Sequence, residues 1–292
     1  MTSPRSRLRA LLAQPGCTDA APVFDPFSAR VAEMNGWPVA KLSGSVSKMA
    51  NVSAPDGLPL ANMTDLADIC RRICRNTDLP LVADADEGGG NAITLRATIR
   101  DLEMAGVAAI EIEDNLVPQS TQAAARRHAL MVPLEEHLGK LRAAVAARRD
   151  PATIIVARSF ALSELPRAEA LARIRAYAQT GAEAVMLADL PGGPADLVEV
   201  ADAAGLPLFV LGVPQRDRDD PEFLRRTRLK LRFLPHRPFR AALAAMDAAY
   251  RALRDGGTAL PDPTATPENA AIVDRLCRRQ ALDDWERRYL PG

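Results

Sequence analysis

Three carboxylates stand where two neighbouring strands are predicted to end. Asp84 and Asp86 close the run LPLVADAD, and Glu113 follows the next apolar run, Ala108 to Ile112. Residues two apart on a strand point to the same side, and parallel neighbours end at the same edge of a sheet. We therefore expect the three side chains to converge on one spot.

Such a cluster needs a positive charge, because three carboxylates within ~5 Å repel one another strongly in a partly dry site. Neither motif contains a His or Cys, so the oxygen-only set favours Mg²⁺ or Mn²⁺ over Zn²⁺. The alternative is that these acids cap loops or pair with arginines nearby. Gly88, Gly89 and Gly90 follow directly and permit either close approach of the backbone to a ligand or only a flexible turn.

The elements that position these acids alternate regularly along the chain. Short apolar runs are separated by Ala-, Leu- and Arg-rich stretches with helical spacing, the pattern of strands joined by crossover helices. Gly106, Gly181 and Gly205 each follow a helical stretch, where a left-handed residue is favoured. The predicted strands are Pro22 to Phe24, Val39 to Ser43, Leu79 to Asp84, Ala108 to Ile112, Thr153 to Arg158, Ala184 to Leu187, Leu208 to Leu211 and Leu229 to Leu234. The predicted helices are Asp65 to Arg75, Ala92 to Ala105, Leu134 to Ala147, Arg167 to Thr180, Ala195 to Ala203 and Phe239 to Arg254.

Eight strand and helix units in about 240 residues favour closure over an open doubly wound sheet, so the predicted fold is an α/β, (β/α)8 TIM barrel. We interpret residues 1–292 as a single domain, with 258–292 as a C-terminal helical extension. The Gly- and Pro-rich link after Arg254 would let the terminal helices cover a partner subunit or their own barrel.

The composition indicates a small-molecule partner. The 292 residues carry 37 Lys and Arg against 37 Asp and Glu, so no net field favours nucleic acid or an anionic membrane. No apolar stretch approaches the ~20 residues of a membrane span, and the N-terminus lacks a signal-peptide core, which predicts a cytoplasmic protein. The cysteines are expected to be thiols, with Cys70 and Cys74 on a buried helix face rather than in a metal or redox pair.

The longest irregular connection, Asn115 to Pro133, is expected to be a lid over the site, with a surface insertion as the alternative. His128 within it and His137 just after it are interpreted as surface residues rather than catalytic ones. The polar residues of this segment are Gln119, Ser120, Thr121, Gln122, Arg126, Arg127 and His128.

Several motifs resemble those of the isocitrate lyase and phosphoenolpyruvate mutase superfamily, from about residue 17 to 160 and more weakly through His236. The central motifs are Asp84-Ala85-Asp86 with the following glycines and Asn91, Thr98 to Glu103, Ala105-Gly106 and Ile112-Glu113-Asp114. The others are Phe24-Asp25-Pro26 with Ser28-Ala29-Arg30, Ser43-Gly44-Ser45-Val46, Ala54-Pro55-Asp56, and Ile155 to Ser159.

The resemblance implies a barrel whose last helix is exchanged between subunits of a homodimer or homotetramer. It also implies a Mg²⁺ site that chelates a 2-oxo acid or its enolate. In this sequence Asp84, Asp86 and Glu113 match the metal positions, some of them acting through water.

The resemblance also assigns substrate contacts. Ser45 and the backbone around it, including Val46, match the turn that binds a carboxylate. Arg158 matches the arginine that holds a substrate carboxylate, and Asp56 matches an acid near the substrate.

Within the superfamily the chain is most similar to the oxaloacetate decarboxylase branch. The lyases carry a lid cysteine as acid or base, and residues 115–133 contain none. The lid of the mutases and phosphonopyruvate hydrolases is rich in Lys, Asn and Ser, a pattern not evident here. The Ser43 to Val46 turn, Ala54-Pro55-Asp56, the lid start Glu113 to Gln119 and His236 match the decarboxylases.

That branch implies Mg²⁺-dependent decarboxylation of oxaloacetate, or a related 2-oxo dicarboxylic acid, to pyruvate and CO₂ through a metal-stabilised enolate. Arg158 would fix a carboxylate, Ser45 would orient the chelated end, and His236 would contact substrate or help deliver a proton. The alternative for His236 is a structural histidine, and for Arg158 a partner of the acidic cluster. The alternative functions are a C–C or P–C bond lyase or mutase acting on a bulkier 2-hydroxy or phosphono acid, and a catalytically silent relative.

Three residues depart from the superfamily pattern. Glu87 stands where relatives usually have His or Thr, and Gly89 where an aromatic residue is common. Glu111 is acidic at a position that usually is not, two residues before Glu113 and so on the same face. It would tighten the metal, pair with Arg158, or repel a dianionic substrate.

Overall fold

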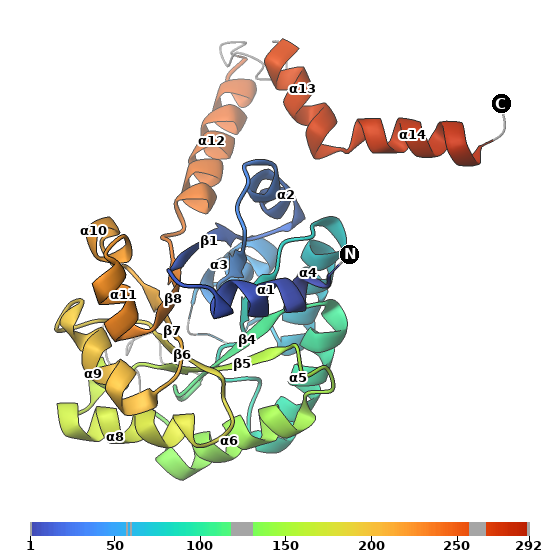
Figure 1. Cartoon of the computed structure of the whole chain (residues 1–292). Coiled ribbons are helices and arrows are strands. Elements are labelled where there is room, and N and C mark those ends of the chain that lie inside the picture. Colours follow the sequence, from blue (N-terminus) through green and yellow to red (C-terminus); the bar gives the residue numbers. More distant parts are fainter. Residues whose placement is uncertain (1, 57, 59, 118–130, 257–266, 291–292) are drawn as a thin grey trace.

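Eight parallel strands close into a barrel in chain order, and β8 pairs with β1 (Figure 1). The structure is a computed structural model that describes residues 2–56, 58, 60–117, 131–256 and 267–290. The TIM-barrel prediction is confirmed. The strands are β1 Thr18–Val23, β2 Ala40–Leu42, β3 Leu81–Asp84, β4 Ala109–Glu113, β5 Ile154–Ser159, β6 Ala184–Leu187, β7 Leu208–Leu211 and β8 Leu229–Phe233.

Helices link the strands, and most of them surround the barrel (Figure 1). In chain order they are α1 Pro4–Ala13, α2 Pro26–Met34, α3 Gly44–Val52, α4 Met63–Asn76, α5 Ala92–Ala105, α6 Leu134–Ala147, α7 Ala161–Glu164, α8 Arg167–Ala178, α9 Ala195–Ala204, α10 Gln215–Arg218, α11 Pro221–Thr227, α12 Arg237–Arg254, α13 Pro267–Leu276 and α14 Arg279–Tyr289.

The eight predicted strands all exist, and β6, β7, α5 and α6 have the predicted bounds. Helices α1, α2 and α3 were not predicted, because they are short and weakly periodic. Helix α2 instead depends on its start: Ser28 N donates to Asp25 Oδ1 at 2.7 Å, and Asp25 N donates to Ser28 Oγ at 3.1 Å. The three predicted loop glycines are left-handed, with φ of 99° at Gly106, 92° at Gly181 and 66° at Gly205.

The barrel has an apolar interior that is closed at its amino end by α1. Leu8 of α1 is fully buried against interior residues such as Val82 and Phe209. Arg5 Nε donates to Val107 O just before β4, and Arg9 Nε donates to Ala152 O just before β5, both at 3.0 Å. This helix therefore seals one end, and the polar residues at the strands' carboxyl ends line the other.

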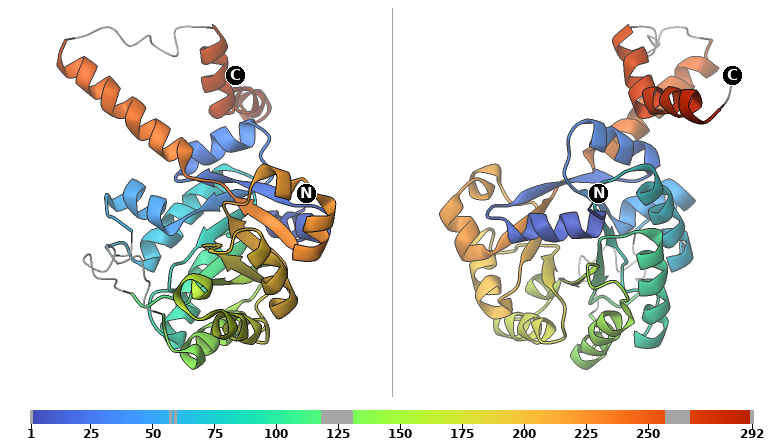
Figure 2. Two further views of the ribbon diagram at one scale, coloured as in Figure 1. Left: turned by 90° about the vertical axis from the view of Figure 1, so that its left-hand side faces the viewer. Right: turned by 45° about the vertical axis from the view of Figure 1, so that its right-hand side comes forward.

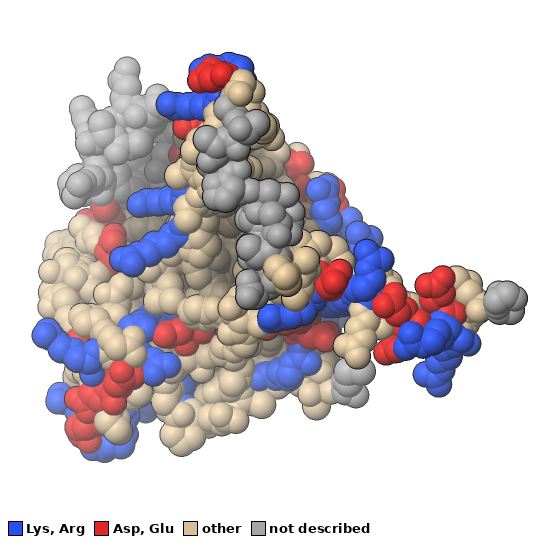
Figure 3. All heavy atoms as spheres, turned by 90° about the horizontal axis from the view of Figure 1, so that it is seen from above, with Lys and Arg blue, Asp and Glu red and all other residues tan. Residues whose placement is uncertain are grey.

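Two further apolar layers separate the barrel from its helices. Cys70 is fully buried in one of them with Cys74 packed beside it, and both are free thiols, as predicted. On the outer surface, Lys and Arg lie among Asp and Glu (Figure 3). No helix in the described residues is long and apolar enough to cross a membrane. Most of the predicted lid, residues 118–130 with its polar residues Gln119 to His128, lies outside the described residues.

The C-terminal helices extend away from the barrel (Figures 1 and 2). None of the 18 residues of α12 is buried. Helix α13 returns to α2, where Arg275 Nη2 donates to Met34 O and Arg30 Nη2 donates to Arg275 O, both at 3.1 Å. Exchange of the last helices between subunits and the single-domain interpretation both stay predictions.

Candidate active site

The three predicted acids converge at the carboxyl end of β3 and β4. Carboxylate oxygens of Asp84, Asp86 and Glu113 all lie within 4.8 Å of one another. One part of the sequence argument was wrong, because β3 ends at Asp84 and Asp86 is not placed by strand alternation. Instead Asp86 has a left-handed backbone, with φ of 47°, which turns its carboxylate back to the site.

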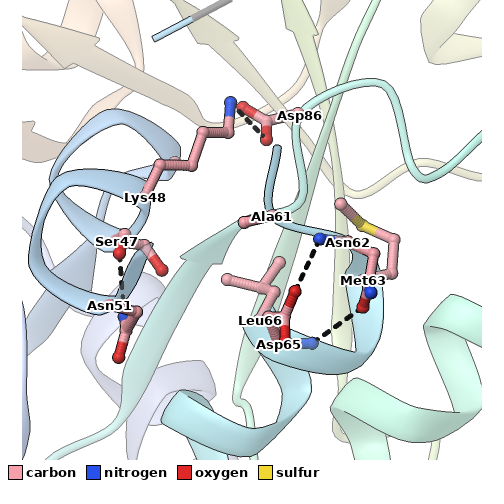
Figure 4. Close-up of a pocket in the computed structure, with 10 residues that line it drawn as sticks. Ser47, Lys48, Asn51, Ala61, Asn62, Met63, Asp65, Leu66 and Asp86 are labelled. Atoms are coloured by element: carbon pink, nitrogen blue, oxygen red, sulfur yellow. Dashed lines mark hydrogen bonds and ion pairs between the residues drawn. The ribbon is translucent and has the colours of Figure 1, made fainter. Parts of the chain in front are cut away.

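Asp86 is held by the segment that follows β2. Its Oδ2 lies 2.8 Å from Nζ of Lys48 on α3, and its Oδ1 fills the space beside Gly44 that a Cβ atom would need. Figure 4 shows Lys48 and Asp86 pointing toward one another at the rim of a pocket between α3 and the start of α4. Lys48 is almost fully buried, so this ion pair is well shielded from water.

Asp84 and Glu113 share one arginine. Arg158 Nη1 pairs with Asp84 Oδ2, and Arg158 Nη2 lies 2.8 Å from Glu113 Oε1. Asp84 also accepts backbone N–H bonds from Gly44 and Asp86, both at 3.1 Å. Arg158 thus neutralises two of the three acids, which is the alternative role foreseen for it.

The three acids of the cluster have shifted pKa values, one lowered and two raised. Burial alone would raise the pKa of Asp84, but the charges of Arg158 and Lys41 outweigh it and hold that pKa well below its usual value. Burial and the neighbouring charge of Asp84 raise the pKa of Asp86 to about 7, against the opposing charge of Lys48. Burial likewise raises the pKa of Glu113 well above its usual value, although Arg158 opposes the rise.

The donor set fits a hard divalent cation. It offers three carboxylates and no His or Cys, and Mg²⁺ and Mn²⁺ prefer oxygen ligands. The second oxygen of Glu113 accepts from Asn115 Nδ2 at 2.9 Å, which orients the carboxylate. Asp84, Asp86 and Glu113 would hold the ion.

Ser45 and Val46 lie in the first turn of α3, directly beside Gly44. Backbone N–H groups in a first turn have no acceptor within their own helix, and the N-cap residue Ser43 makes no capping bond from its side chain. The Ser45 hydroxyl lies 3.2 Å from that of Ser43. This turn can therefore bind a carboxylate, as helix N-termini do.

Asp56 and His236 border the site from two other segments. Asp56 is exposed and lies 3.4 Å from Lys48 Nζ, so Lys48 links it to Asp86. His236 precedes α12 and is partly buried. Burial, then the charges of Lys41 and Arg240, lower the pKa of His236, which keeps its ring neutral at pH 7.

Comparison with known proteins assigns the chain to a family. The family model described as phosphoenolpyruvate phosphomutase matches residues 8–254. The chain belongs to the phosphoenolpyruvate phosphomutase family. An oxaloacetate decarboxylase of Rhodopseudomonas palustris (strain BisB5) is 36% identical over 286 residues, which cover 98% of this chain and 96% of that relative.

Solved structures agree with this membership of the phosphoenolpyruvate phosphomutase family. A phosphoenolpyruvate phosphomutase from Streptomyces platensis subsp. rosaceus has a TM-score of 0.82 at 28% identity, with 98% of this chain and 99% of that chain covered. A phosphonopyruvate hydrolase in complex with oxalate and Mg²⁺ has a TM-score of 0.81 at 26% identity, with 99% and 100% covered. The superfamily resemblance of the motifs is confirmed.

Two lysines near this family site were missed from the sequence. Lys41 of β2 forms an ion pair with Glu111 inside the barrel, and Lys48 holds Asp86. A lysine in the predicted buried strand Val39 to Ser43 was a signal that a charged partner had to lie inside. Of the three roles foreseen for Glu111, the structure has the pairing with Arg158, at 3.5 Å.

The expectation for His137 needs correction. His137 is not at the surface: it is fully buried against the Tyr177 ring, with centroids 4.7 Å apart, and burial lowers its pKa to about 3. A Cβ atom on Gly88 would overlap Leu95, and one on Gly89 would overlap Met63. These glycines therefore let the turn pack closely against α5 and α4.

Proposed function

We propose that this family member is a divalent-metal-dependent decarboxylase that converts oxaloacetate, or a related 2-oxo dicarboxylic acid, to pyruvate and CO₂. The observation that carries the proposal is the convergence of Asp84, Asp86 and Glu113 within 4.8 Å beside Arg158. Relatives named oxaloacetate decarboxylase, at 36% and 35% identity, support this choice of substrate.

The chain's own residues would bind and orient the substrate. The Arg158 guanidinium would hold one carboxylate through paired N–H donors. The backbone N–H groups of Ser45 and Val46 would bind the end of the substrate next to the metal site, with the Ser45 hydroxyl beside them. Mg²⁺ or Mn²⁺, when bound, would supply positive charge for the enolate that develops as CO₂ leaves.

Proton transfer to the product carbon would fall to groups at the edge of the site. We propose that His236 contacts substrate or helps to deliver the proton, and that Asp56 is the acid near the substrate. The sequence of residues 115–133 contains no cysteine, so the thiol that would serve a C–C cleavage of isocitrate type is missing from the lid.

A second candidate is a C–C or P–C bond lyase or mutase acting on a bulkier 2-hydroxy or phosphono acid. The structural likeness to a phosphoenolpyruvate phosphomutase and to a phosphonopyruvate hydrolase favours it. A third is a silent relative, in which Glu87, Gly89 and Glu111 have left binding without turnover. The first two candidates differ in the substrate that they consume, and the third consumes none.

Pyruvate release from oxaloacetate tests the proposal. The protein with Mg²⁺ should release pyruvate faster than a blank with the same Mg²⁺ and no protein, and EDTA should abolish the difference. Asp86→Ala should abolish it too, whereas Asp68→Ala, which removes an exposed acid on α4, should not. If oxaloacetate is inert and a phosphono acid or larger 2-hydroxy acid is consumed, the second candidate replaces the first. Binding of Mg²⁺ and oxalate with no turnover of any substrate would favour the third.

We also propose that the chain works as a homodimer or homotetramer in which the last helices are exchanged. Helix α12 presents Leu243, Met246, Tyr250 and Leu253 to solvent, each at least half exposed. These residues recur at helical spacing, so they form one apolar stripe that a second copy of the chain would cover. A cytoplasmic location remains a prediction from the sequence.

A further inference from the structure

A further pair of buried charges lies inside the barrel, next to the three acids. Lys41 of β2 and Glu111 of β4 both point into the barrel, and Lys41 Nζ lies 2.6 Å from Glu111 Oε2. Their side chains are 6% and 0% exposed. In the strand register Lys41 is level with Val82, two residues before Asp84 on β3, whereas Glu111 is level with Asp84 itself. The ion pair therefore crosses β3 inside the barrel, from the level of Val82 to the level of Asp84, next to the proposed metal site.

In the described residues, Arg158 forms ion pairs with three acids. Glu111 is the one of these that does not belong to the proposed metal site. Arg158 Nη1 pairs with Asp84 and lies 3.5 Å from Glu111 Oε2, while Nη2 pairs with Glu113. A cation that binds Asp84 and Glu113 competes with Arg158 for these two carboxylates. Glu111 is then the remaining acid that can keep the Arg158 guanidinium in place.

Glu111 and Arg158 each have a buried polar atom without a hydrogen-bond partner among the described residues. Within the described part of the chain, Glu111 Oε1 and Arg158 Nε are buried without a hydrogen-bond partner. Lys41 neutralises Glu111 at shorter range than Arg158 does, 2.6 Å against 3.5 Å. Glu111 therefore does not cancel the positive charge of Arg158, and this charge becomes available for an anionic ligand when a cation binds Asp84 and Glu113.

We propose that Glu111, with Lys41 as its counterion, is a positioning residue that holds Arg158 ready for the substrate carboxylate once a cation occupies Asp84, Asp86 and Glu113. The inference rests on the proposed function, because it assumes that the cation and Arg158 act on the same 2-oxo acid. It goes beyond that function by giving the pair Lys41 and Glu111 a role in substrate affinity. The competing explanation is that the pair only stabilises the barrel.

The test is oxalate binding at saturating Mg²⁺, measured by calorimetry on the full chain together with thermal unfolding. Glu111→Gln leaves Lys41 buried and unpaired, so it should lower stability. It should also weaken oxalate binding about tenfold, because Arg158 loses the one charged neighbour that stays with it when a cation is bound. The double variant Lys41→Met, Glu111→Gln removes both charges. It should recover stability while oxalate binding remains about tenfold weaker.

Glu111→Asp keeps the charge and should recover part of the oxalate affinity. Oxalate binding at the parent level in the double variant would overturn the inference, because the pair would then be purely structural. Absence of oxalate binding in the parent protein would overturn it as well. The proposed function fails separately: if pyruvate is not released but the double variant binds oxalate weakly, the positioning role stands and only the reaction is wrong.

Discussion

The Asp86 carboxylate occupies the space that a Cβ atom on Gly44 would need. Gly44 opens α3 after β2, and Asp86 lies in the loop after β3, so two neighbouring strand ends meet at this contact. The backbone N–H of Gly44 also donates to Asp84 at 3.1 Å. One glycine therefore sets the position of two of the three proposed metal ligands.

Gly44→Ala should weaken Mg²⁺ binding at least about tenfold, because the methyl group displaces the Asp86 carboxylate and a misplaced ligand is lost to the ion. Titration calorimetry with Mg²⁺ measures this directly. The matched control is Gly139→Ala in α6, where a Cβ atom meets nothing within 4 Å. That variant should bind Mg²⁺ like the parent and gain up to about 1 kcal/mol of stability. Parent-like affinity in Gly44→Ala would contradict the role of this contact.

Arg158→Gln should bind Mg²⁺ several-fold more tightly than the parent in the absence of substrate. Arg158 neutralises Asp84 and Glu113, so removing it takes away a competitor for the same carboxylates. The same variant should lose oxalate affinity and turnover, since a carboxylate clamp is gone. Arg71→Gln, an exposed arginine on α4, is the control for a lost positive charge. Weaker Mg²⁺ binding in Arg158→Gln would show that Arg158 supports the ion instead of competing with it.

His137 should make the protein less stable as the pH falls from about 6.5 toward 3. Its folded pKa is about 3, below the usual 6.5, so in that window the unfolded chain takes up a proton that the folded chain does not. The free energy of unfolding should fall by up to about 1.4 kcal/mol per pH unit from this group and be unaffected by it above pH 6.5. Urea unfolding at several pH values measures this effect. The plot of unfolding free energy against pH should have a shallower slope for His137→Leu than for the parent. Equal slopes in the two proteins would contradict a buried, neutral His137.

Met246→Asp should convert the oligomer to a monomer, if α12 is covered by a second subunit. Met246 is 50% exposed in the single chain and lies in the stripe with Leu243 and Tyr250. Ala248→Asp is the control, because position 248 is on the opposite side of the same helix. Light scattering coupled to size exclusion gives the subunit number. A parent protein that is already monomeric would contradict the proposed exchange.

Periodicity made the barrel predictable, because strand and helix repeats depend on local sequence. Ala184–Leu187, Leu208–Leu211 and Ala92–Ala105 have the bounds that the pattern predicts. Helices α2 and α3 were missed because each has only nine residues, too few for a clear apolar repeat. The signal for α2 was the capping sequence around Asp25, not its periodicity.

The convergence of the acids was predictable, but their partners were not. Asp84 and Glu113 close adjacent parallel strands, so their proximity follows from chain order. The pairing of Lys41 with Glu111 depends on a lysine reaching past the intervening strand, which no local pattern encodes. His137 was placed at the surface because it comes just after the predicted lid, whereas its ring packs as an aromatic group on Tyr177.

The central claim is that Asp84, Asp86 and Glu113 hold a divalent cation that displaces Arg158. A crystal structure of the protein with Mn²⁺ and oxalate, with anomalous diffraction used to locate the metal, tests it most directly. We expect one strong Mn²⁺ peak within coordination distance of these carboxylates or of waters bound to them, with Arg158 on oxalate and Glu111. No peak among the three acids, with Arg158 still paired to Asp84 and Glu113, would contradict the claim.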